Sequence, residues 1–136
     1  MSEIQQKIKL RELEIVDEND QVRIRLAVKA NSPTIELLDQ NGKVAGQIDV
    51  SVDGYPKLEF SSVADQLLNV KLELDPKGSH LKFDHQQGAS SYLFLNNQGI
   101  SGLVMVDVKQ QRKFAATVNE QGELNFEPEY LHQSAK

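Results

Sequence analysis

The chain has 136 residues, of which 39% are hydrophobic, and it carries a formal net charge of −5 and no cysteine. This length fits one domain with a sizeable core. The lack of cysteine excludes disulfide scaffolds, thiolate zinc sites and thiol catalysis. Acidic and basic residues are interleaved, without the clustered basic surface that nucleic acid or an anionic membrane requires. We therefore expect neither nucleic acid nor a membrane as the partner.

The first residues are polar and do not resemble a signal peptide, and no apolar run approaches the length of a membrane span. These features predict a cytoplasmic protein, or one that is assembled into a phage or virion particle.

Residues 1–12 are predicted to form a separate N-terminal segment. The alternation of apolar and polar residues slips by one step just before residue 13. Such a slip indicates either a bulged strand or a short helix that uses Ile4, Ile8 and Ile15.

Residues 13–126 contain a repeated pattern. Six segments begin with an apolar residue, any residue and a second apolar residue, and they are spaced 22, 23, 23, 22 and 21 residues apart. The six starts are Leu13-Glu14-Ile15, Ile35-Glu36-Leu37, Leu58-Glu59-Phe60, Leu81-Lys82-Phe83, Leu103-Val104-Met105 and Leu124-Asn125-Phe126. The third copy is degenerate, but the regularity predicts a repeated structural unit.

Each copy combines a short strand, a polar turn, a longer alternating strand such as 22–28, and a second turn. Period-two alternation places apolar side chains on one face of a strand and charged side chains on the other. Asp, Asn and Gly are the residues that tight turns require, and short connections join antiparallel neighbours. The sequence therefore predicts an all-β, up-and-down antiparallel meander of about eleven strands, without a helix in residues 13–126.

Residues 127–136 form a polar C-terminal tail with Pro128 and few apolar residues. We expect this tail to be frayed or to contain a minor helical turn.

A flat sheet of eleven strands is about 50 Å wide, and its apolar face would expose on the order of 900 Å². Monomeric proteins rarely show a contiguous apolar patch above about 300–600 Å². The face can be covered if the sheet folds into a sandwich, closes into a barrel, or is covered by other copies in a homo-oligomer. The oligomer and the sandwich are favoured over the barrel.

The histidines do not match a recognisable metal site. His80 and His85 lie beside Asp75 and Asp84 across one short strand, which makes a metal ion conceivable, but the spacing fits no zinc signature. Turn histidines in solvent are the favoured interpretation. We therefore predict no metal and no cofactor.

The acidic turns begin like calcium loops at residues 17–20 and 39–42, but the full D-x-[DN]-x-[DN]-G pattern with its distal glutamate is absent. The serines at 61, 62, 90, 91 and 101 have no histidine and acid partner that the sequence suggests. No catalytic residue is predicted.

The aromatic residues are interpreted mainly as packing residues. The five phenylalanines fall at apolar-face positions, although the register of Phe94 stays open. Tyr55 and Pro56 follow a turn tip, and they are the one pair predicted as a possible contact with a partner. The charged residues Arg23, Arg25, Lys71 and Glu73 are interpreted as a solvated face with cross-strand ion pairs.

Two segments resemble a known type of repeat. Residues 10–26, LRELEIVDENDQVRIRL, and residues 35–44, IELLDQNGKV, are similar to the short "LxLxDxxGKxRxxL" repeats of uncharacterised bacterial and phage-related proteins. The resemblance covers the first two copies and fades afterwards. It implies a bacterial, repetitive β architecture and assigns no catalytic residue.

Three functions follow as hypotheses. The leading one is a non-enzymatic structural or protein-interaction scaffold that assembles with itself or with another protein. The alternative is a small β-barrel that carries an apolar ligand in a cavity. That cavity would be lined by Phe60, Leu72, Phe83, Phe94 and Phe114. The last is a hydrolase or isomerase that uses His80, His85 and Asp84.

Overall fold

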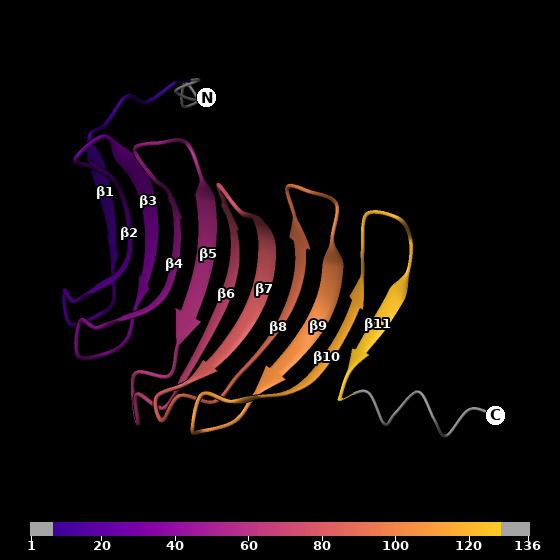
Figure 1. Cartoon of the computed structure of the whole chain (residues 1–136). Helices are drawn as coiled ribbons and strands as arrows, with labels where there is room; N and C mark the ends of the chain where they lie inside the picture. The colour runs from indigo at the N-terminus through magenta and orange to yellow at the C-terminus, as the bar shows by residue number, and fades with distance from the viewer. Residues whose placement is uncertain (1–6, 129–136) are drawn as a thin grey trace, which may run out of the picture.

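A computed structural model describes residues 7–128 of the chain, and these residues form one antiparallel sheet of eleven strands (Figure 1). The strands are β1 (Glu12–Val16), β2 (Val22–Lys29), β3 (Ser32–Leu38), β4 (Val44–Val50), β5 (Pro56–Ser61), β6 (Leu68–Asp75), β7 (Gly78–His85), β8 (Ser90–Asn96), β9 (Ser101–Val106), β10 (Arg112–Val118) and β11 (Leu124–Glu127). Each strand pairs with the next one in the sequence, so the predicted meander without helices is confirmed.

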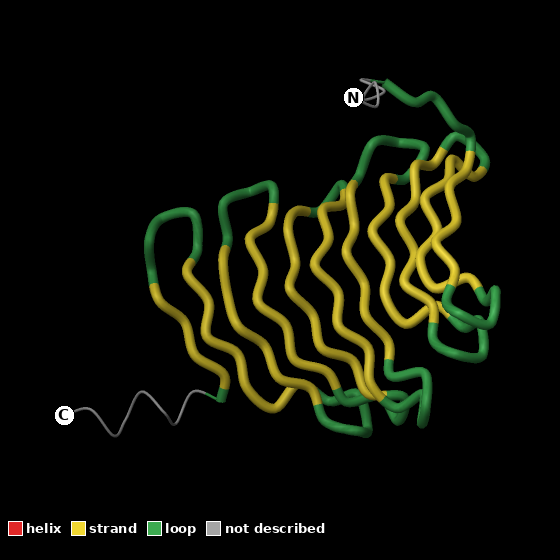
Figure 2. The backbone as a smooth tube through the Cα atoms, turned by 180° about the vertical axis from the view of Figure 1, so that it is seen from behind, coloured by secondary structure: helices red, strands yellow, loops and turns green. Residues whose placement is uncertain are grey.

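The sheet is an open single layer (Figure 2). Each strand contacts only its neighbours in the sequence, and within the described range β1 and β11 each have one unpaired edge. Residues 7–128 therefore form neither a closed barrel nor a two-layer sandwich. Two of the three predicted ways to cover the apolar face are absent from the described part of one chain, because no strand returns to pack on the sheet.

The ends of the described range differ from the repeat. Residues 7–11 are neither strand nor helix, and Ile15 lies in β1, so this stretch does not form the helix that the sequence left open. A shift in the pairing of β1 with β2 occurs between Ile15 and Val16. At the other end β11 extends to Glu127. The predictions for Ile4 and for residues 129–136 lie outside the described residues.

One turn design recurs along the chain. In five hairpins the side-chain oxygen of an Asp or Asn accepts hydrogen bonds from the backbone N–H groups two and four residues later. These residues are Asp17, Asp39, Asn96, Asp107 and Asn119. The residue three positions later has a positive φ in every case. Turn formation thus explains the acidic turns that resemble calcium loops.

His85 occupies the same position in the turn between β7 and β8. Its Nδ1 accepts a hydrogen bond from the backbone N–H of Gln87 at 3.1 Å, and the following Gly88 has φ +102°. His85 therefore takes the place of the usual Asp or Asn. This local role accounts for a histidine that the sequence left without one.

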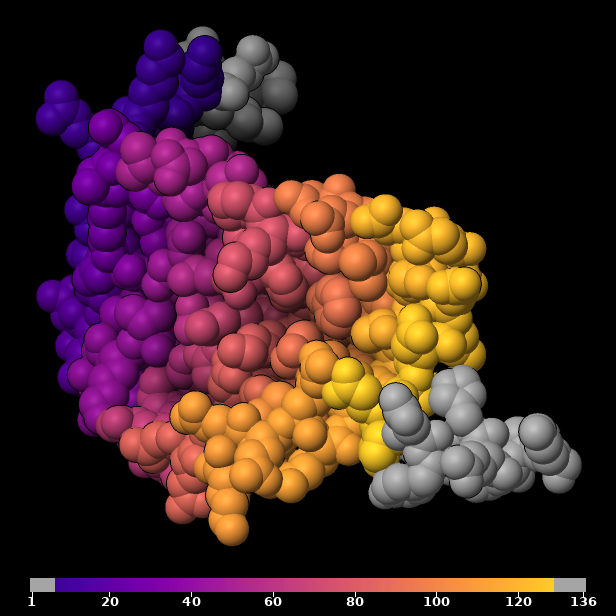
Figure 3. All heavy atoms as spheres, in the orientation of Figure 1, coloured from indigo at the N-terminus to yellow at the C-terminus, as the bar shows by residue number. Residues whose placement is uncertain are grey.

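The sheet is curved, and Figure 3 shows one of its faces hollowed in the middle. Few side chains of residues 7–128 are buried: Leu38, Val104 and Ala115 are the apolar ones, and Thr34 and Glu36 are polar. A single layer has no second layer to bury its side chains, so this scarcity follows directly from the topology.

Candidate interaction surface

The two faces of the sheet are set by an unbroken register. From β1 to β11 a row of directly paired apolar residues crosses the whole sheet. The row consists of Leu13, Leu26, Ile35, Ile48, Leu58, Leu72, Leu81, Leu93, Leu103, Ala116 and Phe126. Directly paired residues of neighbouring strands point to the same side of a sheet, so all eleven lie on one side. A slip of one residue in a strand would move its side chains to the other side.

A second row lies beside the first. It contains Ile15, Ile24, Leu37, Gly46, Phe60, Val70, Phe83, Ser91, Met105 and Phe114. At its glycine a Cβ atom would lie 3.0 Å from ring carbons of Phe60, so this ring covers the backbone of Gly46. We call the two rows together the apolar face. Neither row contains a charged residue.

The opposite side carries the charges. One row there runs through Glu14, Arg25, Glu36, Gln47, Glu59, Lys71, Lys82, Tyr92, Val104, Ala115 and Glu127. We call this side the charged face. Phe94 pairs with His80 and Gly102 and so belongs to the charged face. Its predicted place on the apolar face is wrong, because 92–95 is a continuous apolar run in which alternation does not set the register.

The charged face is held by linked ion pairs. Glu36 Oε1 lies 2.6 Å from Lys29 Nζ, and Glu36 Oε2 lies 3.0 Å from Arg25 Nη1. The same guanidinium contacts Glu14 at 3.0 Å. These hydrogen bonds, first from Lys29 and then from Arg25, hold the pKa of Glu36 below its ordinary value although burial opposes this. Glu36 is therefore ionised at neutral pH in spite of its burial.

A second group of charges lies further along the same face. Lys57 Nζ lies 2.9 Å from Glu59 and 3.6 Å from Asp49. Burial alone would raise the pKa of Glu59, but hydrogen bonds from Lys57 and Asn69 lower it. Lys71 Nζ lies 4.0 Å from the same Glu59. The predicted cross-strand ion pairs are thus present for Arg25 and Lys71, and each group joins three strands.

In β3 the charged face is less exposed to solvent than the apolar face. The side chain of Glu36 is 8% exposed, whereas its neighbour Ile35 on the apolar face is 40% exposed. Side chains converge on the inner side of a curved sheet, so the charged face lines the inside of the curve and the apolar face the outside. Arg25, Lys71 and Glu73, which the sequence interprets as part of a solvated face, are half-buried on this inner side.

The apolar face is exposed over most of its length. Its exposed side chains include Leu13, Ile15, Leu26, Ile35, Leu37, Ile48, Phe60, Leu72, Phe83, Leu93 and Met105. Near β1 to β4 the face forms an open groove of about 620 Å³, to which Ile8 and Leu10 contribute. The apolar side chains of the charged face, such as Tyr92, Phe94 and Val104, are half-buried or buried.

The whole chain exposes 10471 Å², whereas a compact monomer of 15.3 kDa would expose about 7,100 Å². The fourteen terminal residues outside the described range could account for at most about 2,300 Å² if fully extended. At least about 1,000 Å² of excess surface therefore belongs to the open sheet, a value of the same order as its apolar face.

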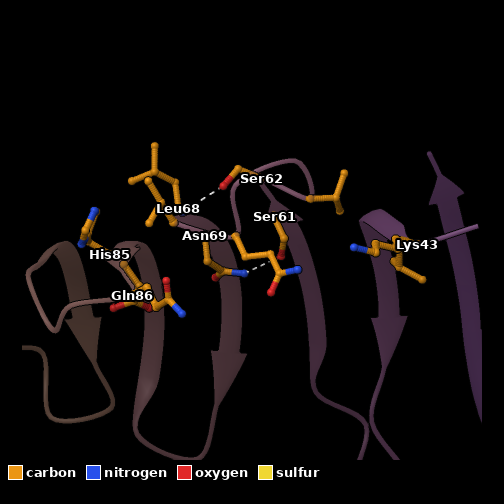
Figure 4. Close-up of a pocket in the computed structure, with 12 residues that line it drawn as sticks. Lys43, Ser61, Ser62, Leu68, Asn69, His85 and Gln86 are labelled. Carbon is orange, nitrogen blue, oxygen red and sulfur yellow. Dashed lines mark hydrogen bonds between the residues drawn. The ribbon is translucent and has the colours of Figure 1, made fainter. Parts of the chain in front are cut away.

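A second hollow lies at one end of the sheet, between the turns that follow β3, β5 and β7 (Figure 4). Its polar side chains hold the local chain. Ser62 Oγ donates to Asp65 and accepts from the N–H of Leu68, and Ser61 Oγ accepts from the side-chain amide of Asn69. These contacts link the ends of β5 and β6 and the loop between them, and His85 Nδ1 accepts a hydrogen bond in its own turn, so the polar groups of this hollow hold the turns in place.

The histidines do not meet. His80 and His85 are five residues apart in β7, so their side chains leave opposite faces of the sheet, roughly 16 Å apart along the strand. Within residues 7–128 there is no group of three or more His, Asp or Glu side chains that could hold a metal ion. The odd spacing of His80 and His85 along a predicted strand was the signal in the sequence that could have placed their side chains on opposite faces.

Tyr55 ends the turn before β5, and Pro56 is the first residue of β5. Both are exposed, Pro56 pairs with Val50, and the backbone oxygen of Tyr55 accepts the N–H of Ser51. Their predicted role as a partner contact stays a prediction. The sequence reasoning did not single out the two apolar rows as a residue-level site, although the six repeat starts already contained many of their members.

No protein-family model matches the chain, and no curated protein matches it either. In the part of the chain that the structure describes, no helix is long and apolar enough to cross a bilayer.

Proposed function

We propose that the chain is a non-enzymatic structural scaffold that assembles with itself or with another protein through its apolar face. The observation that carries this proposal is the unbroken row of eleven paired residues, Leu13 to Phe126, of which most are exposed. A surface of about 900 Å² without a charge is expected to be covered in a functional protein.

The repeat supports a scaffold. A chain in which each strand contacts only its neighbours is held together by local interfaces, as in other repeat proteins, and it presents one long surface. Such surfaces serve extended protein contacts. The carrier hypothesis, in contrast, required a closed barrel, and the open sheet of residues 7–128 encloses no such cavity.

Selective labelling of introduced cysteines tests the proposal, since the chain has no cysteine of its own. The first variant, Leu93→Cys, places a thiol on the apolar face of β8, and the matched control, Gln98→Cys, places one in the exposed turn that follows. Both variants would be expressed in the cells that naturally make the protein and treated with a small maleimide.

We expect the thiol at position 93 to react at least about tenfold more slowly than that at position 98, because a covered side chain is shielded from the reagent. In denaturant the two rates should become similar. Equal rates in intact cells would show an uncovered apolar face and would contradict the scaffold proposal.

A further inference from the structure

We propose that the partner on the apolar face is a second copy of this chain, packed face to face around a two-fold axis. This inference rests on the proposed function, and it names the partner.

The length of the apolar face restricts the partner. Ten spacings of about 4.8 Å separate β1 from β11, so the row of paired apolar residues is about 48 Å long. A single helix would need about 32 residues to follow it. The chain itself carries a surface of the required length, width and uncharged character, and an isologous dimer brings that surface against itself.

The area also fits a dimer. Full contact would bury about 900 Å² on each copy, or about 1,800 Å² in total, which lies within the range of specific protein interfaces. The face lies on the outside of a curve, so two copies would meet first at the middle strands. Contact must therefore spread over about two thirds of the face to bury about 1,200 Å², the lower end of that range.

The charged face does not compete for this role. Its charges are already paired with one another, as in the contacts of Glu36 with Arg25 and Lys29. Covering these groups would remove water from ions without offering new partners. Two copies that meet through their apolar faces keep both sets of charges towards solvent.

The open edges favour a closed assembly over a fibre. Because eleven strands alternate in direction, β1 and β11 run the same way (Figure 1). Adding a copy head to tail in one continuous sheet would require β11 of one copy to pair in parallel with β1 of the next. That pairing lacks the antiparallel geometry used at every other junction. Self-association through the apolar face ends at a dimer, because each copy has one such face and an isologous contact covers it on both copies.

Sedimentation equilibrium of the full chain tests the inference. We expect a mass of twice 15.3 kDa at micromolar concentration. The decisive variant is Leu72→Glu in the central strand β6, and the matched control is Leu124→Glu in the edge strand β11. The two leucines are 50% and 53% exposed, so the same charge costs each isolated sheet a similar amount.

In a dimer only the central position is fully covered. We expect Leu72→Glu to weaken dimerisation by about 100-fold or more, since it buries an unpaired charge, and Leu124→Glu by less than about fivefold. Circular dichroism reports whether each variant keeps its sheet. If Leu72→Glu fails to fold, Leu72→Thr, which suits a strand, should still weaken the dimer by about tenfold.

A monomer at all concentrations, a trimer or larger species, or equal effects at positions 72 and 124 would overturn the inference. The cysteine experiment separates this failure from that of the scaffold proposal. A thiol at position 93 that is shielded in cells but reacts freely in the purified chain would identify a different protein as the partner. The scaffold proposal would then stand without the dimer.

Discussion

The two faces of this sheet share the same strands and the same register, yet they differ in what holds them. On the charged face, ion pairs link neighbouring strands, and Glu36 is almost fully buried. On the apolar face, Ile35 in the same strand is 40% exposed. The charged face therefore pairs its charges within one chain. The apolar face leaves its side chains in solvent, and we propose that a partner covers them.

The largest expected loss of stability comes from separating two strands, which disturbs both faces of the sheet. Gly78 has φ +147°, and a Cβ atom there would lie 2.2 Å from the backbone oxygen of Leu95. Gly78→Ala must therefore push β7 away from β8 and disturb both sets of rows. We expect a loss of about 3 kcal/mol or more in the free energy of unfolding, measured by urea denaturation.

The control for this change is Gly99→Ala, at a turn glycine with φ +83° and no atom near its absent Cβ. Only backbone strain is added there, which costs about 1–2 kcal/mol. If the two variants lost equal stability, close packing between β7 and β8 would not be the reason for Gly78.

The next effect compares one residue from each face of β3. Ile35→Ala should cost about 2–4 kcal/mol if the apolar face is covered, as for a buried side chain, and about 1 kcal/mol if the face stays in solvent. Urea denaturation at two protein concentrations distinguishes the two values. If a second copy covers the apolar face, the urea midpoint depends on protein concentration.

Glu36→Gln makes the matching change on the charged face. It leaves Lys29 and Arg25 without their shared carboxylate, so we expect a loss of about 1–3 kcal/mol that does not depend on protein concentration. A loss that grew with dilution would mean that the charged face also takes part in assembly.

The fold was predictable where alternation is strict, and it was not where alternation fails. The repeat starts and the Asp and Asn turns predicted about eleven strands, the meander and an apolar face. Phe94 was misplaced because its neighbours in β8 are also apolar. The curvature, and with it the burial of Glu36, depends on how all eleven strands twist together, which no local pattern contains.

Acid should act on the charged face before the apolar face. Hydrogen bonds from backbone N–H groups lower the pKa of Asp17, Asp39 and Asp107, and ion pairs lower that of Glu36. Their pKa values are lower in the folded than in the unfolded state, so the unfolded chain binds more protons in acid. Their stabilisation is present at neutral pH and is lost as the pH falls below about 4.

Thermal unfolding followed by circular dichroism between pH 7 and pH 2.5 measures this effect. We expect a steady fall in melting temperature below about pH 4. A melting temperature that stayed constant down to pH 2.5 would contradict the role assigned to these carboxylates.

Met105 offers the most direct test of the covered apolar face, because it reports on the unmodified chain. Its side chain lies in the second apolar row and is 46% exposed in the single sheet. The measurement is the rate at which dilute hydrogen peroxide oxidises Met105 in the purified protein, followed by mass spectrometry and compared with the rate in urea. The account predicts oxidation at least about tenfold slower in the native protein, and faster on dilution below the dimer dissociation constant. A native rate close to that in urea at every concentration would contradict it.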